Sequence, residues 1–471
     1  MLKINKIQLA LILIILIFLA IKIPQIDFRY GDENIYFQMG NLIAQGQMPY
    51  QDFFLASPPL QVLLIALIIF LFGFNIYLLK LIPILCLIGS AIFIYKILAS
   101  QKEKLAGVFA SFLYLFSFLI LTTSDYFSGV HLTIFLCLVS LYLICKNKPV
   151  WAGLLSALAL LTRFYAAPII LALIIFILLN KNKRKHFWKF LLTSGSIFIG
   201  INLILYLIFK QNYISDVLLY HLLKFEEQSR LMVLQFFLNW DWPLLILAGL
   251  SFFIIKIKKL ILPIIGIITT GLFLYLFKDI YYLYFNLLLP FIAILAGLLL
   301  AKIIIISLNY QKYFVYFISG GIILALALLS FSHINFYLKD HANSARIDYI
   351  KDLNNFIIQN SNQEDKIYGS FEIAPLVAIM TNRQIVGNFI DTNNKTFSTN
   401  MFDLTEREKI LAKEKVKFII AKTLVNQKGQ LLELGGFISL NFLNSHCQVA
   451  KTYPIKKDYY SNLLVVWECR F

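Results

Sequence analysis

Long apolar blocks recur along most of this chain of 471 residues. The blocks run for about 18 to 22 residues with almost no charge, which is the length that a helix needs to cross a hydrocarbon layer. The clearest blocks are residues 7–24, 105–122, 164–180, 189–209, 281–301 and 313–331. The pattern predicts membrane-spanning helices and not the core helices of a soluble protein.

Composition and charge support this class. Hydrophobic residues make up 60% of the chain and charged residues only 14%, against about 25% charged in ordinary globular proteins. The formal net charge is +17. Clusters of basic residues lie in the short linkers between apolar blocks, at 102–104, 146–148, 181–189 and 256–259. Cytoplasmic loops of membrane proteins collect Lys and Arg in this way, so the charge indicates topology and argues against a nucleic-acid partner.

The N-terminal block, 7–24, has two interpretations. A basic start before an apolar run is typical of a cleaved signal peptide. However, the run is too long, and no small-residue cleavage site follows Pro24. We therefore expect a retained first helix that leads into an outer loop over 25–75.

The basic linkers stay cytoplasmic only if residues 58–73 lie along the outer membrane surface instead of crossing it. Pro58 and Pro59 suit the start of a helix there, and Gly73 suits its end. About eleven spans remain. They are 7–24, 76–98, 105–123, 128–145, 149–162, 165–180, 189–209, 240–255, 260–277, 280–301 and 312–331. We expect a polytopic α-helical protein of the plasma (inner) membrane.

The first outer loop holds the first candidate site. Asp32 and Glu33 follow the first span by a few residues, and the apolar positions after them recur at helical spacing, which predicts a short amphipathic surface helix. Ionisable groups at a membrane boundary need a reason to be there. One reason is catalysis; the alternative is a solvated acidic cap favoured by the helix dipole.

The order of motifs in this loop resembles the GT-C glycosyltransferases. An apolar helix is followed by Asp-Glu, by a Tyr three residues later, and then by G-x-x-P-Y-x-D-F-F, P-P-L and L-F-G-F-N. In this sequence these elements include Asp32, Glu33, Tyr36, Gly46, Pro49, Tyr50, Asp52, Pro58, Pro59 and Gly73. The likeness is to the branch of protein O-mannosyltransferases and lipid A aminoarabinose transferases, and it covers about the first 180 residues. Members of that branch carry a juxtamembrane helix where 58–73 lies.

The resemblance implies roles for these residues. Asp32, with Glu33 beside it, would be catalytic, and Tyr36, Tyr50 and Asp52 would line a substrate site. The donor would be a polyprenyl-phosphate sugar, and a lipid monophosphate has less need of a divalent ion than a diphosphate has. The chain departs from the family at Ser57, because several relatives carry a basic or imidazole side chain near this position. One phosphate contact is therefore missing or comes from elsewhere.

Two further candidates lie in later outer loops. Asp125, in TTSDYFSGVH, is expected on the same face as Asp32, as a second carboxylate of an acceptor site or as the N-cap of the next helix. Arg163 interrupts an apolar stretch after Thr162, where the family commonly has Lys. An Arg in this setting pairs with an anion, and a lipid phosphate is the natural partner; the alternative is snorkelling to ordinary headgroups.

The later loops carry weaker signals. Lys278 and Tyr282 begin the segment KDIYYLYFN and are further candidates for the phosphate site, although Tyr is common at membrane interfaces. Residues 210–239 are expected to form a mixed-charge outer loop. Its ionisable residues are Asp216, His221, Lys224, Glu226, Glu227 and Arg230.

The chain changes character after His333. Residues 340–471 predict a small extracytoplasmic α/β domain, with helices near 343–360, from 374 and from 405, and strands near 366–371, 384–388 and 417–422. Thr405 and Glu408 fit a capping box. No phosphate-binding Gly loop, nucleophile elbow or Cys-x-x-Cys metal motif occurs, so the role of the domain stays open.

Two strands, roughly 447–454 and 462–470, predict a C-terminal hairpin around a turn at 456–461. Pairing about that turn places Cys447 opposite Cys469, within reach of a disulfide bond in an oxidising compartment. A ladder shifted by one residue would leave both thiols free. The other cysteines lie inside predicted spans.

Taken together, the sequence predicts a GT-C-like transmembrane module over 1–335 and an extracytoplasmic domain over 340–471. The predicted function is inverting transfer of a hexosyl or pentosyl group from a polyprenyl-phosphate donor to a lipid, glycan or protein acceptor on the outer face, without cofactor or obligatory metal. A transporter or flippase of lipid-linked sugars is the alternative, but inverted repeats and midplane polar groups are not evident. A non-enzymatic envelope assembly protein is a third possibility.

Overall fold

The computed structural model divides the chain into two compact units. The first contains Met1–Ile26, Lys80–Leu203 and Glu226–His341, and the second contains Asp27–Leu79, Ile204–Phe225 and Ala342–Phe471. The structure describes residues 6–224, 229–307, 312–341, 346–399, 401–425, 431–434, 436–455 and 462–471. The second unit therefore groups the predicted first outer loop with the predicted C-terminal domain, and the boundary between 1–335 and 340–471 stays a prediction.

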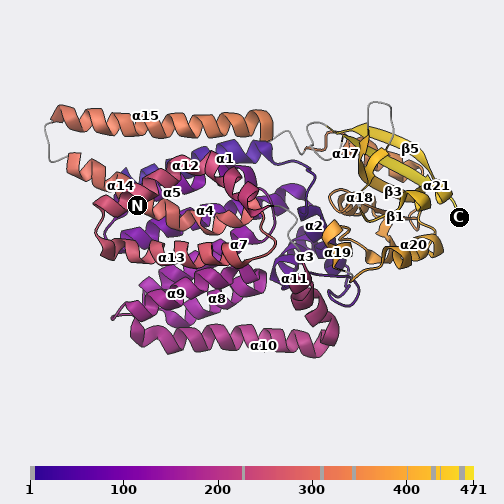
Figure 1. Ribbon diagram of the computed structural model, residues 1–471, viewed down its shortest axis with the longest axis horizontal. Coiled ribbons are helices and arrows are strands. Elements are labelled where there is room, and N and C mark those ends of the chain that lie inside the picture. Colours follow the sequence, from indigo (N-terminus) through magenta and orange to yellow (C-terminus); the bar gives the residue numbers. More distant parts are fainter. Residues whose placement is uncertain are drawn as a thin grey trace. The chain divides into compact units, whose positions relative to one another are not determined.

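Apolar helices build the first unit (Figure 1). They are α1 (Lys6–Lys22), most of α4 (Ile76–Ser100), α5 (Lys104–Leu115), α6 (Phe118–Thr123), α7 (Val130–Cys145), α8 (Pro149–Thr162), α9 (Ala167–Leu179), much of α10 (Phe187–Ile214), α12 (Arg230–Ile254), α13 (Ile257–Leu276), α14 (Leu289–Ser307) and α15 (Lys312–Phe336). Helix α14 packs against α5 and α12, α7 packs against α8, and α9 packs against α13. A Cβ at Gly297 of α14 would lie 2.6 Å from the Ala106 carbonyl oxygen of α5, so this contact requires the missing side chain.

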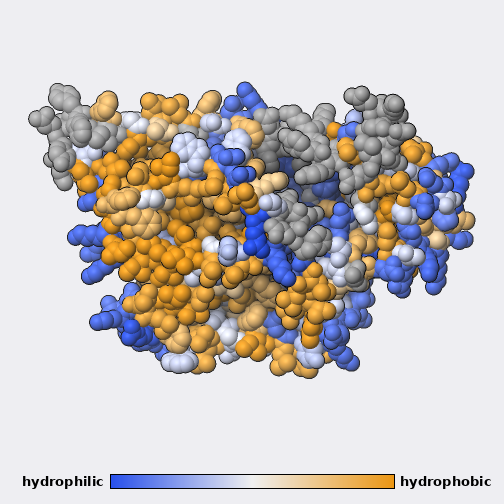
Figure 2. All heavy atoms as spheres, viewed as in Figure 1, coloured by the Kyte–Doolittle hydropathy of each residue, from blue (hydrophilic) through white to orange (hydrophobic). Residues whose placement is uncertain are grey.

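Within the described residues, seven helical segments are long and apolar enough to cross a membrane, and five shorter apolar helices accompany them. Large apolar side chains such as Leu192, Ile199 and Leu207 of α10 are exposed, and Figure 2 shows apolar atoms covering much of the surface of the helical part. A water-soluble protein does not expose so large an apolar surface. The prediction of a polytopic membrane protein is confirmed.

The predicted span 105–123 is broken into α5 and α6. Ser117 adopts extended backbone at the break. The carboxylate of Asp241, buried in α12, accepts hydrogen bonds from the backbone nitrogens of Phe118 (2.9 Å) and Leu119 (3.1 Å). These are free N–H groups of the first turn of α6, so Asp241 satisfies the end that the break creates.

Helices α2 (Glu33–Ala44) and α3 (Leu60–Phe72) pack together in the second unit. Helix α3 coincides with the surface helix expected at 58–73, and Gly73 ends it with a φ of +70°. The loop expected at 210–239 is mostly helical instead: α10 continues to Ile214, a π-helix covers Ser215–Leu219, and α11 covers Tyr220–Leu223. Glu226 and Glu227 lie outside the described residues.

A mixed sheet forms the C-terminal part of the second unit, with strand order β2-β1-β3-β6-β5 and β4 paired to β3. The strands are β1 (Lys366–Gly369), β2 (Gln384–Ile385), β3 (Phe418–Val425), β4 (Leu431–Leu434), β5 (Cys447–Pro454) and β6 (Leu463–Cys469). Strand β1 runs parallel to β2 and β3, whereas β6 is antiparallel to β3 and β5. Figure 1 shows helices α17 (Ile350–Gln359), α18 (Ala374–Thr381), α20 (Leu404–Lys413) and α21 (Leu440–His446) around this sheet.

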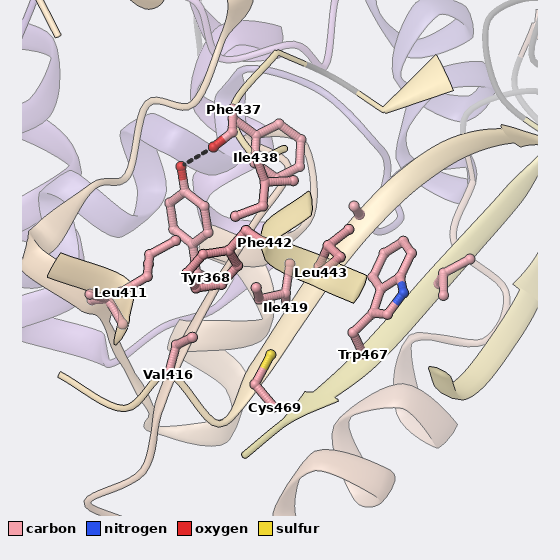
Figure 3. Close-up of a cluster of buried hydrophobic side chains, with 13 residues drawn as sticks. Tyr368, Leu411, Val416, Ile419, Phe437, Ile438, Phe442, Leu443, Trp467 and Cys469 are labelled. Carbon is pink, nitrogen blue, oxygen red and sulfur yellow. Dashed lines mark hydrogen bonds between the residues drawn. The ribbon is translucent and has the colours of Figure 1, made fainter. Parts of the chain in front are cut away.

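The core of this sheet is apolar with one satisfied hydroxyl. The buried Tyr368 hydroxyl donates to the Phe437 carbonyl oxygen over 2.9 Å, in a cluster that also contains Ile419 and Trp467 (Figure 3). The cap of α20 differs from the prediction. Asp403, and not Thr405, is the N-cap, because its carboxylate accepts from the Thr405 backbone nitrogen, while Glu408 accepts from Ser439.

The C-terminal hairpin has the predicted register. Cys447 pairs with Cys469 across β5 and β6, and the two form a disulfide bond with Cα atoms 3.9 Å apart. An irregularity between Val449 and Lys451 shifts the ladder by one residue only beyond the cysteines. The predicted turn at 456–461 lies outside the described residues.

Candidate functional site

Asp32 stands at the entrance to helix α2 in the second unit. Asp32 is half-buried and is the N-cap residue of α2, but its side chain makes no capping hydrogen bond to the helix. Both interpretations of this residue, catalysis and an acidic cap favoured by the helix dipole, therefore stay predictions.

The surroundings of Asp32 favour the neutral acid. Burial is the main cause that raises the pKa of Asp32 to about 7, because it removes water from the charged form. The carboxylates of Asp391 and Glu372 raise this pKa as well. Lys395 and Lys224 lower it. A carboxyl group with a pKa near neutrality is suited to accept a proton in catalysis.

Three segments of the second unit supply the charges that act on the Asp32 carboxyl group. Asp32 belongs to the first loop, Lys224 follows α11, and the remaining neighbours belong to the C-terminal part of the chain. The sequence analysis identified only Asp32. Glu372, Asp391 and Lys395 gave no signal, because they are ordinary polar residues in the loops of an α/β domain.

Backbone contacts join the first loop to the C-terminal part. The backbone nitrogen of Ile347 donates to the Phe28 carbonyl oxygen over 3.0 Å. The side-chain amide of Asn34, in the first turn of α2, donates to the Glu372 carbonyl oxygen over 2.6 Å. Helix α18 packs against α2. These contacts fix the loop that carries Glu372 next to the start of α2.

The other first-loop candidates differ in environment. Glu33 is buried, and Tyr36 is half-buried on α2. Tyr50 is buried, and its hydroxyl donates to the Ser57 carbonyl oxygen over 2.7 Å. Asp52 is exposed, and its carboxylate accepts from the Met48 backbone nitrogen over 2.7 Å, which closes a turn. Tyr50 and Asp52 therefore hold the loop in shape, and a substrate role for either stays a prediction.

Residues 54–57 pack on the helical segment that follows α10. The His221 imidazole contacts the Ala56 carbonyl oxygen at 2.6 Å, and the Asp216 carboxylate accepts from the Leu55 backbone nitrogen at 3.2 Å. Several relatives carry a basic or imidazole side chain near Ser57, and in this chain the His221 imidazole contacts the carbonyl group of the residue before Ser57.

Asp125 lies in the first unit, in a buried ion pair. The Lys22 ammonium nitrogen is 3.0 Å from one carboxylate oxygen, and Lys80 is 3.9 Å from the other. Lys22 also donates to the Leu121 carbonyl oxygen and the Tyr337 hydroxyl. The sequence analysis missed both lysines, although a lone Lys inside an apolar block is itself a signal. Asp125 does not cap α7, which was one of its expected roles, since the N-cap is Gly129.

Arg163 is buried in the first unit at the end of α8. Its Nε donates to the Ser128 carbonyl oxygen over 2.9 Å. Tyr284 lies within the electrostatic reach of both Arg163 and the buried Asp279, and accepts a hydrogen bond of 2.8 Å from Tyr165. The buried ionisable residue of the KDIYY segment is therefore Asp279, which the sequence analysis did not select.

Lys278 and Tyr282, the other phosphate-site candidates, are less enclosed. Lys278 is exposed, and Tyr282 is half-buried with its ring against Phe236 and Tyr281. Among the described residues, no three His, Cys, Asp or Glu side chains gather as a metal ion would require. The expected independence from metal stays a prediction.

Comparison with known proteins shows one family model that matches part of the chain and a fold that solved structures share. The model of the dolichyl-phosphate-mannose-protein mannosyltransferase family matches residues 56–209. No curated protein sequence matches the chain. The matched segment includes α3 and most of the helices up to α10.

Solved structures resemble almost the whole chain. ArnT from Cupriavidus metallidurans superimposes with a TM-score of 0.65 at 13% identity, over 97% of each chain, and ArnT bound to undecaprenyl phosphate does so with a TM-score of 0.61. The Archaeoglobus fulgidus oligosaccharyltransferase gives 0.62 at 14% identity, over 98% of this chain and 75% of that one. Mycobacterial arabinofuranosyltransferase AftD gives 0.56 at 10% identity, over 98% and 40%. The predicted resemblance to GT-C glycosyltransferases is confirmed as a shared fold.

Proposed function

From its GT-C fold, we propose that this chain is a membrane glycosyltransferase that moves a hexosyl or pentosyl group from a polyprenyl-phosphate donor to an acceptor on the outer face of the plasma membrane. The observation that carries the proposal is the half-buried Asp32 carboxyl, whose pKa is raised to about 7 chiefly by burial. The family-model match and the structure of ArnT bound to undecaprenyl phosphate support the class of donor.

In the proposed reaction, ionised Asp32 accepts the proton of an acceptor hydroxyl as that oxygen attacks the anomeric carbon. The bond from the anomeric carbon to the phosphate oxygen breaks, and the lipid phosphate leaves with the electron pair. In-line attack inverts the anomeric centre. An acceptor that is itself a phosphate needs no base, and Asp32 would then orient it.

The departing phosphate needs positive charge. Arg163 is our candidate because a guanidinium group binds phosphate oxygens through two parallel hydrogen bonds. Lys278 and Tyr282 are secondary candidates at the start of the KDIYY segment. Glu33 and Asp125 remain proposed members of the acceptor side, and the acceptor itself is a lipid, a glycan or a protein.

The test replaces Asp32 with Asn, which keeps shape and removes the base. Purified protein in liposomes would receive a panel of synthetic undecaprenyl-phosphate sugars with extracted envelope lipids as acceptors, and mass spectrometry would follow the products. We expect a loss of at least about a hundredfold, with normal membrane insertion. Glu364→Gln, which removes an exposed carboxylate of the C-terminal part, is the matched control. Full activity of Asp32→Asn would remove Asp32 from the mechanism.

The same question can be asked in cells. Mass spectrometry of surface glycans from cells with and without the gene identifies the sugar and the acceptor together. Loss of one glycan on deletion, restored by the wild-type chain but not by Asp32→Asn, is the expected result. Restoration by both would instead favour a protein that moves lipid-linked sugars without transferring them.

A further inference from the structure

Glu372 and Asp391 lie at one edge of the C-terminal sheet. Glu372 follows β1 and Asp391 follows β2 through a short 3-10 helix at Val386–Asn388. Because β1 and β2 are parallel, the loops that leave their carboxyl ends emerge at the same edge. This edge is where α/β sheets commonly place the groups that meet a ligand.

The loop that carries Asp391 is held from both sides. On the sheet side, the Thr392 hydroxyl donates to the Gly369 carbonyl oxygen over 2.8 Å. On the first-loop side, the Asn388 amide donates to the Gln47 side chain (2.9 Å) and to the Asp52 carbonyl oxygen (3.1 Å). The carboxylate of Asp391 accepts from the Asn393 backbone nitrogen over 3.1 Å. The loop that carries Asp391 is thus bonded both to the sheet and to the first loop, and the Asp391 carboxylate is held in place.

Arg407 packs against aromatic residues of the loop that carries Asp391. The guanidinium carbon of the buried Arg407 lies 4.3 Å from the ring centre of Phe389, 4.5 Å from that of Phe397 and 4.9 Å from that of Phe402. The Phe402 ring also meets Phe54 of the first loop, with 5.2 Å between ring centres. Cation–π contacts of this kind favour one arrangement of the aromatic residues, and these residues flank Asp391 in the chain.

Glu372 is also held in place, by an ion pair and by a backbone hydrogen bond. Its carboxylate is 2.5 Å from the Lys422 ammonium nitrogen. Lys422 in turn lies 4.9 Å from the ring centre of Tyr30, two residues before Asp32. With the bond from Asn34 to the Glu372 backbone, both ends of this residue are tied to the first loop.

We propose that the C-terminal part of the chain contributes to the catalytic site, with Asp391 and Glu372 as positioning residues whose loops are bonded to the first loop and whose negative charges act on Asp32. The inference rests on the proposed function of Asp32. The C-terminal part of the chain then has a role in the reaction, through the charge that it places near Asp32.

Charged groups of both signs act on Asp32, and the ion pair with Lys422 offsets part of the charge of Glu372. Asp391 and Glu372 disfavour the ionised form of Asp32, and Lys395 and Lys224 favour it. Burial also raises the pKa of Asp391, and the hydrogen bond from the Asn393 backbone nitrogen lowers it. The positive charges of Lys224, Arg407 and Lys395 lower the pKa of Asp391.

The test measures the protonation of Asp32 without any substrate. Dicyclohexylcarbodiimide reacts with protonated buried carboxyl groups, and peptide mass spectrometry gives the extent of labelling at Asp32 as a function of pH. Asp391→Asn keeps the oxygen that accepts from Asn393 while removing the charge. We expect Asp391→Asn and Glu372→Gln to move the labelling midpoint to lower pH, and Lys395→Gln to move it to higher pH.

Controls separate charge from structure. Asp391→Glu should restore the wild-type midpoint, and Glu364→Gln should leave it unchanged. The pH–rate profile of glycosyl transfer is the second readout, and its acidic limb should follow the labelling midpoint. Unchanged midpoints and unchanged limbs in Asp391→Asn, Glu372→Gln and Lys395→Gln would overturn the inference. The proposed function fails separately, if Asp32→Asn stays active while the midpoints still shift.

Discussion

The ammonium nitrogen of Lys22 lies 3.0 Å from a carboxylate oxygen of Asp125, and both side chains are buried. Lys80 approaches the same carboxylate at 3.9 Å. Asp125 is therefore embedded between two cations from α1 and α4. The Asp125 carboxylate is already paired with these lysines, so an acceptor that binds to it would have to share it with them.

Breaking this pair should destabilise the first unit. Asp125→Asn leaves two buried ammonium groups without their counter-charge, and such losses cost about 3 to 5 kcal/mol in the free energy of unfolding. Thermal unfolding of the purified protein in detergent measures it. Lys259→Gln is the control, because it breaks the partly exposed pair with Glu103, which is worth about 1 kcal/mol or less. A stable but inactive Asp125→Asn protein would point to a direct role in the reaction.

Transfer activity should rise with pH. Asp32 acts as a base only when ionised, and its pKa is raised to about 7, so the ionised fraction increases as pH rises through about 7. Initial rates measured from about pH 5 to pH 9 should show an acidic limb centred near neutrality. A profile that is flat across this interval would mean that Asp32 does not limit the reaction as a base.

Arg163→Ala should weaken use of the donor by about tenfold to a hundredfold, since hydrogen bonds to charged groups contribute roughly 1.5 to 3 kcal/mol. Arg163→Lys should recover part of the loss, because it keeps the charge but not the two-pronged geometry. Binding of undecaprenyl phosphate, followed by native mass spectrometry, measures the effect. Arg184→Gln, in a predicted cytoplasmic linker, should bind normally.

The same residue tests the topology. A cysteine placed at position 163 should react with a membrane-impermeant maleimide from the outer side of intact cells, because the basic linkers are predicted to be cytoplasmic. Reaction only after the cells are opened would contradict both the phosphate role and the orientation.

The Cys447–Cys469 bond should be present in the protein as isolated from membranes under non-reducing conditions. Peptide mapping with and without reductant detects it. The double change to Ser should lower the free energy of unfolding of the C-terminal part by about 3 kcal/mol, the amount expected for closing a loop of this length. Free thiols at both positions in wild-type protein would argue against an oxidising compartment for this part of the chain.

The sequence by itself determined what depends on local pattern. The apolar blocks gave the membrane helices, Gly73 gave the end of α3, and the hairpin register gave the disulfide bond, since each depends on residues close in the chain or on a simple period. The order of motifs that begins at Asp32 predicted the GT-C fold through its resemblance to known glycosyltransferases. The same local reasoning misplaced the N-cap of α20. Asp403 and Thr405 are both good N-cap residues, and the backbone conformation at the start of the helix decides which of them serves.

Only the tertiary structure decided which distant groups meet. Lys22 and Asp125 are 103 positions apart, and Asn34 and Glu372 are 338 apart. Asp241 caps α6 from 123 residues away. Hydropathy and spacing report which face of an element is buried, but they carry no information on the partner across a contact. The carboxylates that surround Asp32 could therefore be found only when the loops of the sheet were in place, since long-range electrostatics depend on distance in space and not on order in the chain.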